Sequence, residues 1–333
     1  MSNWWVFQGN RQPHDGIGKL PLPPRWRHFK GTSQREALFE EPDEQVIQRG
    51  AIFQPGQKEI ELVNAALYLR RPLLITGKPG TGKSSLAYAV AYELKLGPVL
   101  LWPITSRSIL QDGLYKYDAI GRLQEANLHH ATNNGAGPDI GKFIQLGPLG
   151  TALLPSKYPR VLLIDEIDKS DIDLPNDLLN TFEDGQFEIP ELARIASDEP
   201  INVRPHDGSD PVAITRGRVI CQAFPFVVLT SNGEKELPAP LLRRCLRLDI
   251  SVPSAEKLAE IVESHFGETD TEATLNARQK LVKAFVNRRE RGDLATDQLL
   301  NAIYLSGLGI DLNSSATDNK DGLIEAILRH LTT

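Results

Sequence analysis

Eight consecutive residues carry the clearest chemical signal in this chain. Residues 77–84 read Gly-Lys-Pro-Gly-Thr-Gly-Lys-Ser, the G-x-x-x-x-G-K-S pattern of a phosphate-binding loop. Its glycines allow backbone conformations in which several N–H groups point at phosphate oxygens. The residues expected to contact the phosphates are Gly77, Pro79, Gly80, Thr81, Gly82, Lys83, Ser84 and Ser85.

The residues on either side of this loop supply the structure that it needs. An apolar run of strand length, 73–75, precedes it, and 85–96 has apolar residues at helical spacing before a Gly-Pro stop signal. Lys83 is expected to reach the β- and γ-phosphates, and the hydroxyl of Ser84 to bind Mg²⁺. A glycine-rich turn that only spells the pattern is the alternative, and the strand and helix disfavour it.

A second chemical signal is a pair of acids after another apolar run. Residues 161–164 resemble a strand buried on both faces of a parallel sheet, and Asp165 and Glu166 follow directly. Asp165 is expected to hold Mg²⁺, mostly through water, and Glu166 to orient and polarise the attacking water. The alternative is a core strand that merely ends in solvated acids. It does not explain why an acid pair lies 81 residues after Ser84.

Polar groups at the ends of two later segments are further candidates. Asn232 ends the apolar run 226–231, where it would hold the attacking water or the γ-phosphate, although a strand-capping turn explains it equally well. Segment 237–245 reads as a helix that carries Arg243 and Arg244 near its end. Paired arginines are often only solvated, but here they could supply charge to a neighbouring subunit's γ-phosphate.

The chain divides into three parts by composition. Residues 1–45 are rich in aromatic residues and proline, and these aromatics must be buried either on the protein itself or on a partner. Residues 46–250 alternate strand-like and helical segments, with an inserted hairpin or loop near 183–220, and 251–333 are helical throughout. More local expectations are a loop over 131–141, a short hairpin around Asp184-Gly185, and Ile52 and Phe53 as neighbours of an adenine base.

Composition excludes several classes of protein. The chain has 333 residues, 41% of them hydrophobic, and no apolar run reaches the roughly 18 residues that a membrane span needs. Two cysteines are too few for a disulfide framework, and the first residues do not resemble a secretory signal, so a cytoplasmic location is expected. The net charge of −6 gives no support to a broadly nucleic-acid-binding surface, although it leaves room for a local basic stripe.

Four stretches together resemble the AAA+ ATPases, and more closely their MoxR-like branch. The similarity covers about residues 46–310 and rests on GKPGTGKS (77–84), VLLIDEIDKSDIDLPNDLL (161–179), VVLTSN (227–232) and ELPAPLLRRC (236–245). It implies an α/β fold, a three-layer αβα sandwich with a parallel central sheet, followed by a small all-α lid domain. It also implies ATP and Mg²⁺ as ligands.

The resemblance assigns roles to individual residues. Lys83 and Ser84 match the Walker A motif, and Asp165 and Glu166 match Walker B. Asn232 matches sensor 1, and the pair 243–244 matches the arginine finger, with Arg244 the first choice and Arg243 the second. Because the family's finger acts on a neighbouring subunit, the resemblance implies a ring, usually a hexamer.

One departure from the family concerns the lid. Many relatives carry a sensor-2 arginine at the start of the third lid helix, whereas residues 294–298 read Leu-Ala-Thr-Asp-Gln here. Arg288, Arg289 and Arg291 lie nearby, so this role is either displaced or absent. Coupling between the nucleotide and the lid angle is the property that this departure puts in question.

Three functional hypotheses follow. The first is a ring ATPase that remodels or assembles a protein client, together with a partner carrying a von Willebrand A-type domain, as MoxR-like ATPases typically do. The second is an ATP-dependent switch or scaffold with little turnover in a signalling or defence complex, which the absent sensor-2 arginine favours. The third is a DNA-acting ring motor, which the acidic balance of the chain disfavours.

Overall fold

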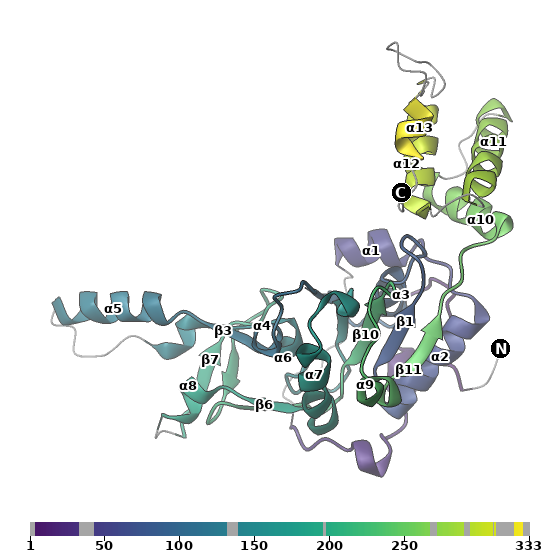
Figure 1. Cartoon of the computed structure of the whole chain (residues 1–333). Helices are drawn as coiled ribbons and strands as arrows, with labels where there is room; N and C mark the ends of the chain where they lie inside the picture. The colour runs from purple at the N-terminus through teal and green to yellow at the C-terminus, as the bar shows by residue number, and fades with distance from the viewer. Residues whose placement is uncertain are drawn as a thin grey trace.

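The computed structural model consists of a larger α/β domain and a smaller helical domain that stands on one side of it (Figure 1). The residues that the structure describes are 4–32, 43–131, 139–195, 198–266, 272–289, 294–308, 310 and 323–328. Within them, no helix is long and apolar enough to cross a membrane. The expected loop over 131–141 falls mostly outside these residues, and its last part is instead the start of a 3-10 turn, Ile140–Phe143.

The larger domain is built on a parallel sheet of five strands. Their order across the sheet is β11 (Leu246–Asp249), β1 (Leu73–Thr76), β10 (Phe226–Ser231), β5 (Val161–Asp165) and β2 (Leu100–Pro103). All four neighbouring pairs run parallel. The apolar runs at 73–75, 161–164 and 226–231 are therefore strands, as the sequence predicts, whereas β11 was not predicted. Its alternation of buried and exposed residues fits a strand at the edge of the sheet.

Helices cover both faces of this sheet, which gives three layers. On one face lie α1 (Glu44–Gly50), α2 (Gln57–Leu69) and α3 (Ser85–Glu93), packed on one set of buried strand residues. On the other face lie α6 (Pro148–Ala152), α7 (Asp173–Asp184) and α9 (Ala239–Arg244), packed on the alternate set. The protein therefore has the three-layer α/β fold that the sequence predicts.

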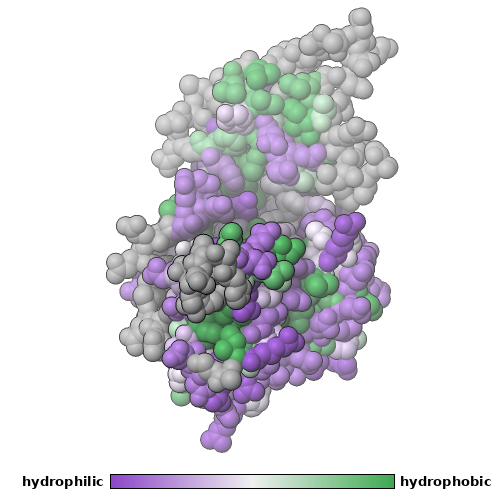
Figure 2. All heavy atoms as spheres, turned by 90° about the vertical axis from the view of Figure 1, so that its left-hand side faces the viewer, coloured by the Kyte–Doolittle hydropathy of each residue, from purple (hydrophilic) through white to green (hydrophobic). Residues whose placement is uncertain are grey.

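A first insertion extends from the edge of the domain at β2. It runs through α4 (Leu110–Leu114), β3 (Tyr115–Tyr117), α5 (Ala119–Ala131) and β4 (Ile144–Leu146), with β3 and β4 paired antiparallel. Helix α5 projects away from the body (Figure 1). Ile120 and Leu123 on this helix are exposed. Seen from this end, the larger domain is mostly hydrophilic, with smaller apolar patches between the hydrophilic regions (Figure 2).

A second insertion follows α7 and corrects one prediction. The expected hairpin around Asp184-Gly185 does not form, because Gly185 adopts a left-handed conformation (φ +60°) and caps the end of α7. Strand β6 (Gln186–Glu188) pairs instead with the distant β9 (Arg218–Ile220). Between them lie α8 (Pro190–Ala193) and a hairpin of β7 (Ile201–Val203) and β8 (Val212–Ile214).

The aromatic N-terminal segment, residues 4–32, packs largely on the larger domain. Phe7 and Phe29 are buried, whereas Trp26 is 82% exposed. The side chain of Asn64 accepts the backbone N–H groups of Val6 and Phe7, at 2.7 and 3.0 Å. Burial on the protein itself thus accounts for part of these aromatics, and Trp26 remains available to a partner.

The smaller domain is helical. Its elements are α10 (Ala255–Phe266), α11 (Glu272–Arg289), α12 (Thr296–Gly307) and α13 (Leu323–Ile327). They share a separate apolar core that includes Leu258, Phe285 and Leu299, each 0% exposed. Residues 250–254 connect β11 to α10, so this domain follows directly from the edge strand of the sheet.

Candidate active site

The polar residues that the sequence singles out meet at the carboxyl ends of the central strands. The loop 77–84 follows β1, Asp165 ends β5, and Asn232 comes directly after β10. These three strands are adjacent and parallel, so their carboxyl ends lie side by side at the edge where open α/β sheets bind ligands. The fold therefore brings together residues that lie up to about 150 positions apart in the sequence.

The phosphate loop has the backbone that its glycines predict. Gly80 and Gly82 take φ angles of +72° and +85°, which side chains rarely tolerate. A Cβ atom at Gly82 would lie 3.1 Å from the ring of Phe53, so Phe53, one of the two residues expected near an adenine, borders this loop. Ser85 begins α3, and the N-terminal end of this helix lies directly after the loop, as anion binding requires.

Lys83 is the cation of this loop and is nearly buried, with 7% of its surface exposed. Its Nζ atom donates to the carbonyl oxygens of Gly77 and Lys78, at 2.7 and 2.9 Å, and to Oδ1 of Asn232, at 2.7 Å. Burial lowers the pKa of Lys83 from its ordinary value, while the acids of the site, Asp165 foremost, oppose this shift. These oxygen partners hold the ammonium group where it can contact a phosphate.

Ser84 and Asp165 form the candidate magnesium site. The Ser84 hydroxyl donates to Oδ1 of Asp165 at 2.7 Å, and the Thr230 hydroxyl donates to the same oxygen at 2.6 Å. Hydroxyl and carboxylate oxygens beside a phosphate loop suit Mg²⁺, which takes few protein ligands and completes its shell with phosphates and water. Among the described residues no group of three or more acids, histidines or cysteines could hold a metal by itself.

Glu166 stands in an unusual backbone conformation. Its φ of +62° is rare for a residue with a side chain, and its N–H donates to Oγ1 of Thr230 at 2.9 Å. Oε2 accepts from Nζ of Lys169 at 2.6 Å, and Oε1 accepts from Nδ2 of Asn232 at 3.3 Å. Asn232 thus bridges Glu166 and Lys83, which places the amide between the candidate base and the phosphate-binding cation.

Sequence reasoning missed three residues that support this arrangement: Thr230, Asp168 and Lys169. Asp168 is 2% exposed, and its Oδ2 accepts the backbone N–H groups of Asn232 and Glu234, at 3.0 and 2.9 Å. This carboxylate fixes the start of the segment that follows β10. The sequence does show Thr230 as a polar residue within VVLTSN and Asp168 as a third acid after Asp165 and Glu166. Neither pattern indicates which distant residue would be its hydrogen-bond partner.

The two arginines of α9 are not part of this cluster. Arg244 pairs with Glu183 near the end of α7, and it donates to the carbonyl of Pro240 at 3.3 Å. The hydrogen bond to Glu183 raises the pKa of Arg244 and lowers that of Glu183. Arg243 is exposed. This helix ends just before the first residue of β11, which runs parallel to β1. Both arginines therefore lie at the amino ends of the strands, whereas the phosphate loop follows the carboxyl end of β1.

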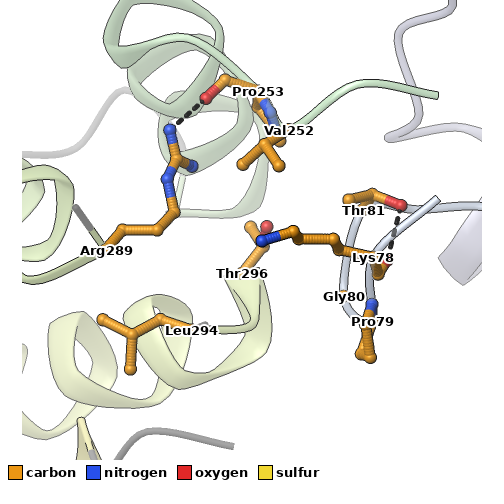
Figure 3. Close-up of a pocket in the computed structure, with 9 residues that line it drawn as sticks. All are labelled: Lys78, Pro79, Gly80, Thr81, Val252, Pro253, Arg289, Leu294 and Thr296. Carbon is orange, nitrogen blue, oxygen red and sulfur yellow. Dashed lines mark hydrogen bonds between the residues drawn. The ribbon is translucent and has the colours of Figure 1, made fainter. Parts of the chain in front are cut away.

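The three arginines considered for the sensor-2 role differ in their position relative to the phosphate loop. Arg289 is the last residue of α11 and borders a pocket beside the phosphate loop (Figure 3), whereas Arg288 is not among the residues lining that pocket. Arg291 lies outside the described residues. Helix α12, the third helix of the smaller domain, begins at Thr296, and no arginine lies in its sequence.

Comparison with known protein families decides the identity of the larger domain. The family described as "ATPase family associated with various cellular activities (AAA)" matches residues 73–254, which is more than half of the chain. The chain belongs to the AAA family. This AAA protein therefore has the nucleotide-binding domain of these ATPases, and the match contains both the phosphate loop and the acid pair.

Solved structures also include similar chains. The crystal structure of the FIGL-1 AAA domain in complex with ADP is 16% identical, with a TM-score of 0.36 over 79% of this chain and 73% of that chain. The structure of C. elegans PCH-2 is 14% identical, with a TM-score of 0.41 over 84% of this chain and 72% of that chain. No curated protein matches the chain.

Proposed function

We propose that this AAA protein hydrolyses ATP as a MoxR-like ATPase in a homo-oligomeric ring, a hexamer, and thereby remodels or assembles a protein partner. The observation that carries the proposal is the separation of the site from its arginines. Lys83, Asp165 and Glu166 meet at the carboxyl ends of the strands, while Arg244 lies at the amino end of β11. Arg244 therefore does not reach the site of its own chain, and a neighbouring copy would supply this charge.

Each residue has a defined task in the proposed reaction. Glu166 accepts a proton from the water that attacks the γ-phosphorus, the bond between this phosphorus and the oxygen of ADP breaks, and ADP and phosphate leave. Lys83 and a neighbour's Arg244 stabilise the charge on the phosphate oxygens, and Asn232 orients the water. Ser84 and Asp165 would hold Mg²⁺, which neutralises phosphate charge when it is bound.

The partners remain part of the proposal. A protein client and a von Willebrand A-type partner follow from the resemblance to MoxR-like ATPases. Trp26, exposed in an otherwise anchored N-terminal segment, is a candidate contact for either of them. The thiols of Cys221 and Cys245 are free and buried, and burial raises their pKa values to about 12, so neither is a reactive group.

One observation favours the second function, an ATP-dependent switch with little turnover. The carboxylate of Glu166 is held by Lys169 at 2.6 Å and by Asn232 at 3.3 Å, so it must leave Lys169 to act as a free base. A partner that displaces Lys169 would then control hydrolysis. In this function, ATP binding alone would drive assembly of a complex.

The deciding experiment is the ATPase rate measured against protein concentration, from nanomolar to tens of micromolar, for the wild-type chain and for Arg244→Ala. Specific activity that rises steeply with concentration and is lost in Arg244→Ala supports catalysis between subunits. A measurable rate that is independent of concentration and unchanged in Arg244→Ala would overturn the ring proposal. ATP binding with no turnover at any concentration would favour the switch.

A further inference from the structure

Arg244 is held along only one side of its guanidinium group. Nε donates to a carboxylate oxygen of Glu183 on α7, and Nη1 donates to the carbonyl oxygen of Pro240 at 3.3 Å. Nη2 has no acceptor in the part of the chain that the structure describes. The side chain is 35% exposed, so a second molecule can reach the donors that remain.

Glu183 lies at the end of α7, where the carbonyl groups of a helix have no partners within the helix itself. The N–H of Gly185 donates to the carbonyl oxygen of Thr181 at 2.9 Å, and Nη1 of Arg27 donates to that of Phe182 at 2.8 Å. Arg27, from the N-terminal segment, thus binds the peptide group directly before Glu183.

Arg27 is itself fixed on several sides. Nε and Nη2 donate to the carbonyl oxygen of Arg70 at 3.1 and 2.5 Å, and the guanidinium carbon lies 4.6 Å from the centroid of the Phe224 ring. That ring stacks on Phe29 of the same N-terminal segment, with centroids 5.2 Å apart. Burial lowers the pKa of Arg27, the nearby charge of Glu183 opposes this shift, and a guanidinium stays charged at physiological pH. Arg27 therefore gives the end of α7 a firm support.

These contacts connect the N-terminal segment with the proposed arginine finger. Residues 4–32 lie outside the range 73–254 that matches the AAA family, yet Arg27 is bonded to the residue before Glu183, and Glu183 is bonded to Arg244. A free arginine side chain samples many rotamers, and ordering it at the moment of reaction costs entropy. A finger that is ordered beforehand avoids this cost.

We propose that Glu183 and Arg27 are positioning residues for ATP hydrolysis, because together they fix the direction in which Arg244 meets the phosphate of a neighbouring copy. This inference rests on the proposed function, in which Arg244 acts across the subunit boundary. Glu183 occupies the Nε side of the guanidinium and leaves Nη2 for the phosphate. Because Arg27 belongs to the N-terminal segment, a partner that moves this segment would change turnover at the adjacent subunit's site.

The first test measures kcat and ATP affinity for variants of the whole chain. Glu183→Ala is expected to lower kcat by about tenfold, since Arg244 regains its rotamers, and to change ATP affinity less than about twofold, since Glu183 does not belong to the phosphate loop. Glu183→Gln keeps an oxygen that accepts from Nε and should retain most of the turnover. Arg27→Ala removes the support of α7 and should lower kcat several-fold. Asp184→Ala and Arg25→Ala, which change exposed neighbours of the same charge, are the matched controls and should keep wild-type kcat.

A second test separates positioning from damage to the fold. In an equal mixture of Glu183→Ala with Glu166→Gln, about one quarter of the sites in a symmetric ring combine an intact base with a correctly held finger. The mixture should therefore reach roughly a quarter of the wild-type rate, about twice the rate of Glu183→Ala alone or more, although half of its subunits lack the base. A Glu183→Ala subunit that is misfolded would not gain in this way.

Other results would overturn the inference. Turnover at or above the wild-type level in Glu183→Ala would mean that Glu183 restrains the finger or has no role in it. Weakened ATP binding, or no gain in the mixture, would mean that Glu183 acts only through the fold. An equal loss in Glu183→Gln would mean that its charge matters rather than its hydrogen bond, and an unchanged kcat in Arg27→Ala would contradict the role of the N-terminal segment. If Arg244→Ala itself keeps wild-type turnover, the proposed function fails, which is distinct from a failure limited to Glu183 or Arg27.

Discussion

Lys83 and Asn232 are joined by a 2.7 Å hydrogen bond from Nζ to Oδ1, although 149 residues separate them in the sequence. The amide nitrogen of the same asparagine donates to Glu166 at 3.3 Å. One neutral side chain therefore sets the relative positions of the phosphate-binding cation and the candidate base. The bond also gives the lysine a partner before any nucleotide is bound, because a nearly buried ammonium group needs one.

This relationship predicts a separation of binding from turnover in Asn232→Ala. We expect turnover to fall by about 10²-fold, as when one preorganised polar group is removed from an active site. ATP affinity should change little, because Lys83 keeps its two carbonyl partners and its contact with phosphate. Steady-state hydrolysis and nucleotide titration measure the two effects. Asn176→Ala, on the exposed face of α7, is the control, and wild-type turnover in Asn232→Ala would exclude the role proposed for the bridge.

The position of Arg244 predicts complementation between two inactive variants. Glu166→Gln lacks the base, Arg244→Ala lacks the finger, and each alone should lose turnover by at least about 10²-fold. If the site is shared, random mixing at equal amounts creates intact interfaces in about one quarter of positions in a symmetric ring. The mixture should then regain about a quarter of wild-type turnover.

The control for this experiment is a mixture of Glu166→Gln with Lys83→Ala. Lys83 and Glu166 belong to the part of the site that each chain supplies for its own nucleotide. A Glu166→Gln subunit always lacks the base and a Lys83→Ala subunit always lacks bound ATP, so no arrangement of the two restores a complete site. This mixture should remain inactive. If the wild-type chain is active and neither mixture regains turnover, Arg244 does not act across subunits. Arg243→Ala would then be mixed with Glu166→Gln in the same way.

Much of the site could be predicted from the sequence because its signals are local. The spacing of glycine, lysine and serine in residues 77–84, with apolar runs before it and after it, determines the strand, the loop and the helix within 24 residues, 73–96. Asp165 and Glu166 likewise follow their strand directly. Patterns of this kind depend on neighbours in the sequence, so they need no tertiary information.

The partners of these residues could not be predicted, because they come from distant strands. Thr230 bonds to Asp165 across 65 residues, and Asp168 bonds to the backbone of Asn232 across 64. The same reason explains the wrong hairpin at Asp184-Gly185. A helix cap and a hairpin turn use the same residue types, and only the long-range pairing of β6 with β9 distinguishes them.

A buried ion pair predicts how stability depends on pH. Arg160 precedes β5, and its guanidinium donates to Asp207 at 2.9 Å, with the side chains 8% and 5% exposed. Burial alone would raise the pKa of Asp207, but Arg160 and the hydrogen bonds from Ser209 outweigh this effect and hold the pKa below its ordinary value. The contribution of the pair is therefore complete above about pH 4, the ordinary pKa of aspartate, and is lost as the pH falls through the lower folded value.

Asp207→Asn should accordingly reduce the free energy of unfolding by about 3 kcal/mol at pH 7, because it leaves the buried charge of Arg160 without an opposite charge beside it. The difference from the wild-type chain should shrink at strongly acidic pH, where Asp207 is itself protonated. Urea titrations at both pH values measure this. Asp198→Asn, which removes an exposed pair with Arg216, is the control and should have little effect. A difference that stays constant with pH would contradict the assignment.

The N-terminal segment predicts a different experiment, centred on Glu93. This carboxylate is 1% exposed and accepts four backbone N–H groups, those of residues 8–11, at distances from 2.5 to 3.3 Å. Each carboxylate oxygen accepts two of these part-buried N–H groups, so the NH₂ group of Glu93→Gln leaves two donors without their acceptor. The expected cost is about 1–3 kcal/mol. Because these bonds anchor the segment, the loss should appear locally before the whole protein unfolds.

Limited trypsin digestion measures this anchoring. In Glu93→Gln the bonds after Arg11 and Arg25 should be cut several-fold faster than in the wild-type chain, while the α/β domain stays intact by mass spectrometry. Glu61→Gln, a change of an exposed acid on α2, should leave the cleavage pattern unchanged. Because Val6, Phe7 and Ile17 share a buried apolar cluster with α2 and α3, release of the segment should also lower the melting temperature. Unchanged cleavage rates in Glu93→Gln would show that the apolar contacts of Phe7 and Phe29 hold the segment without the carboxylate.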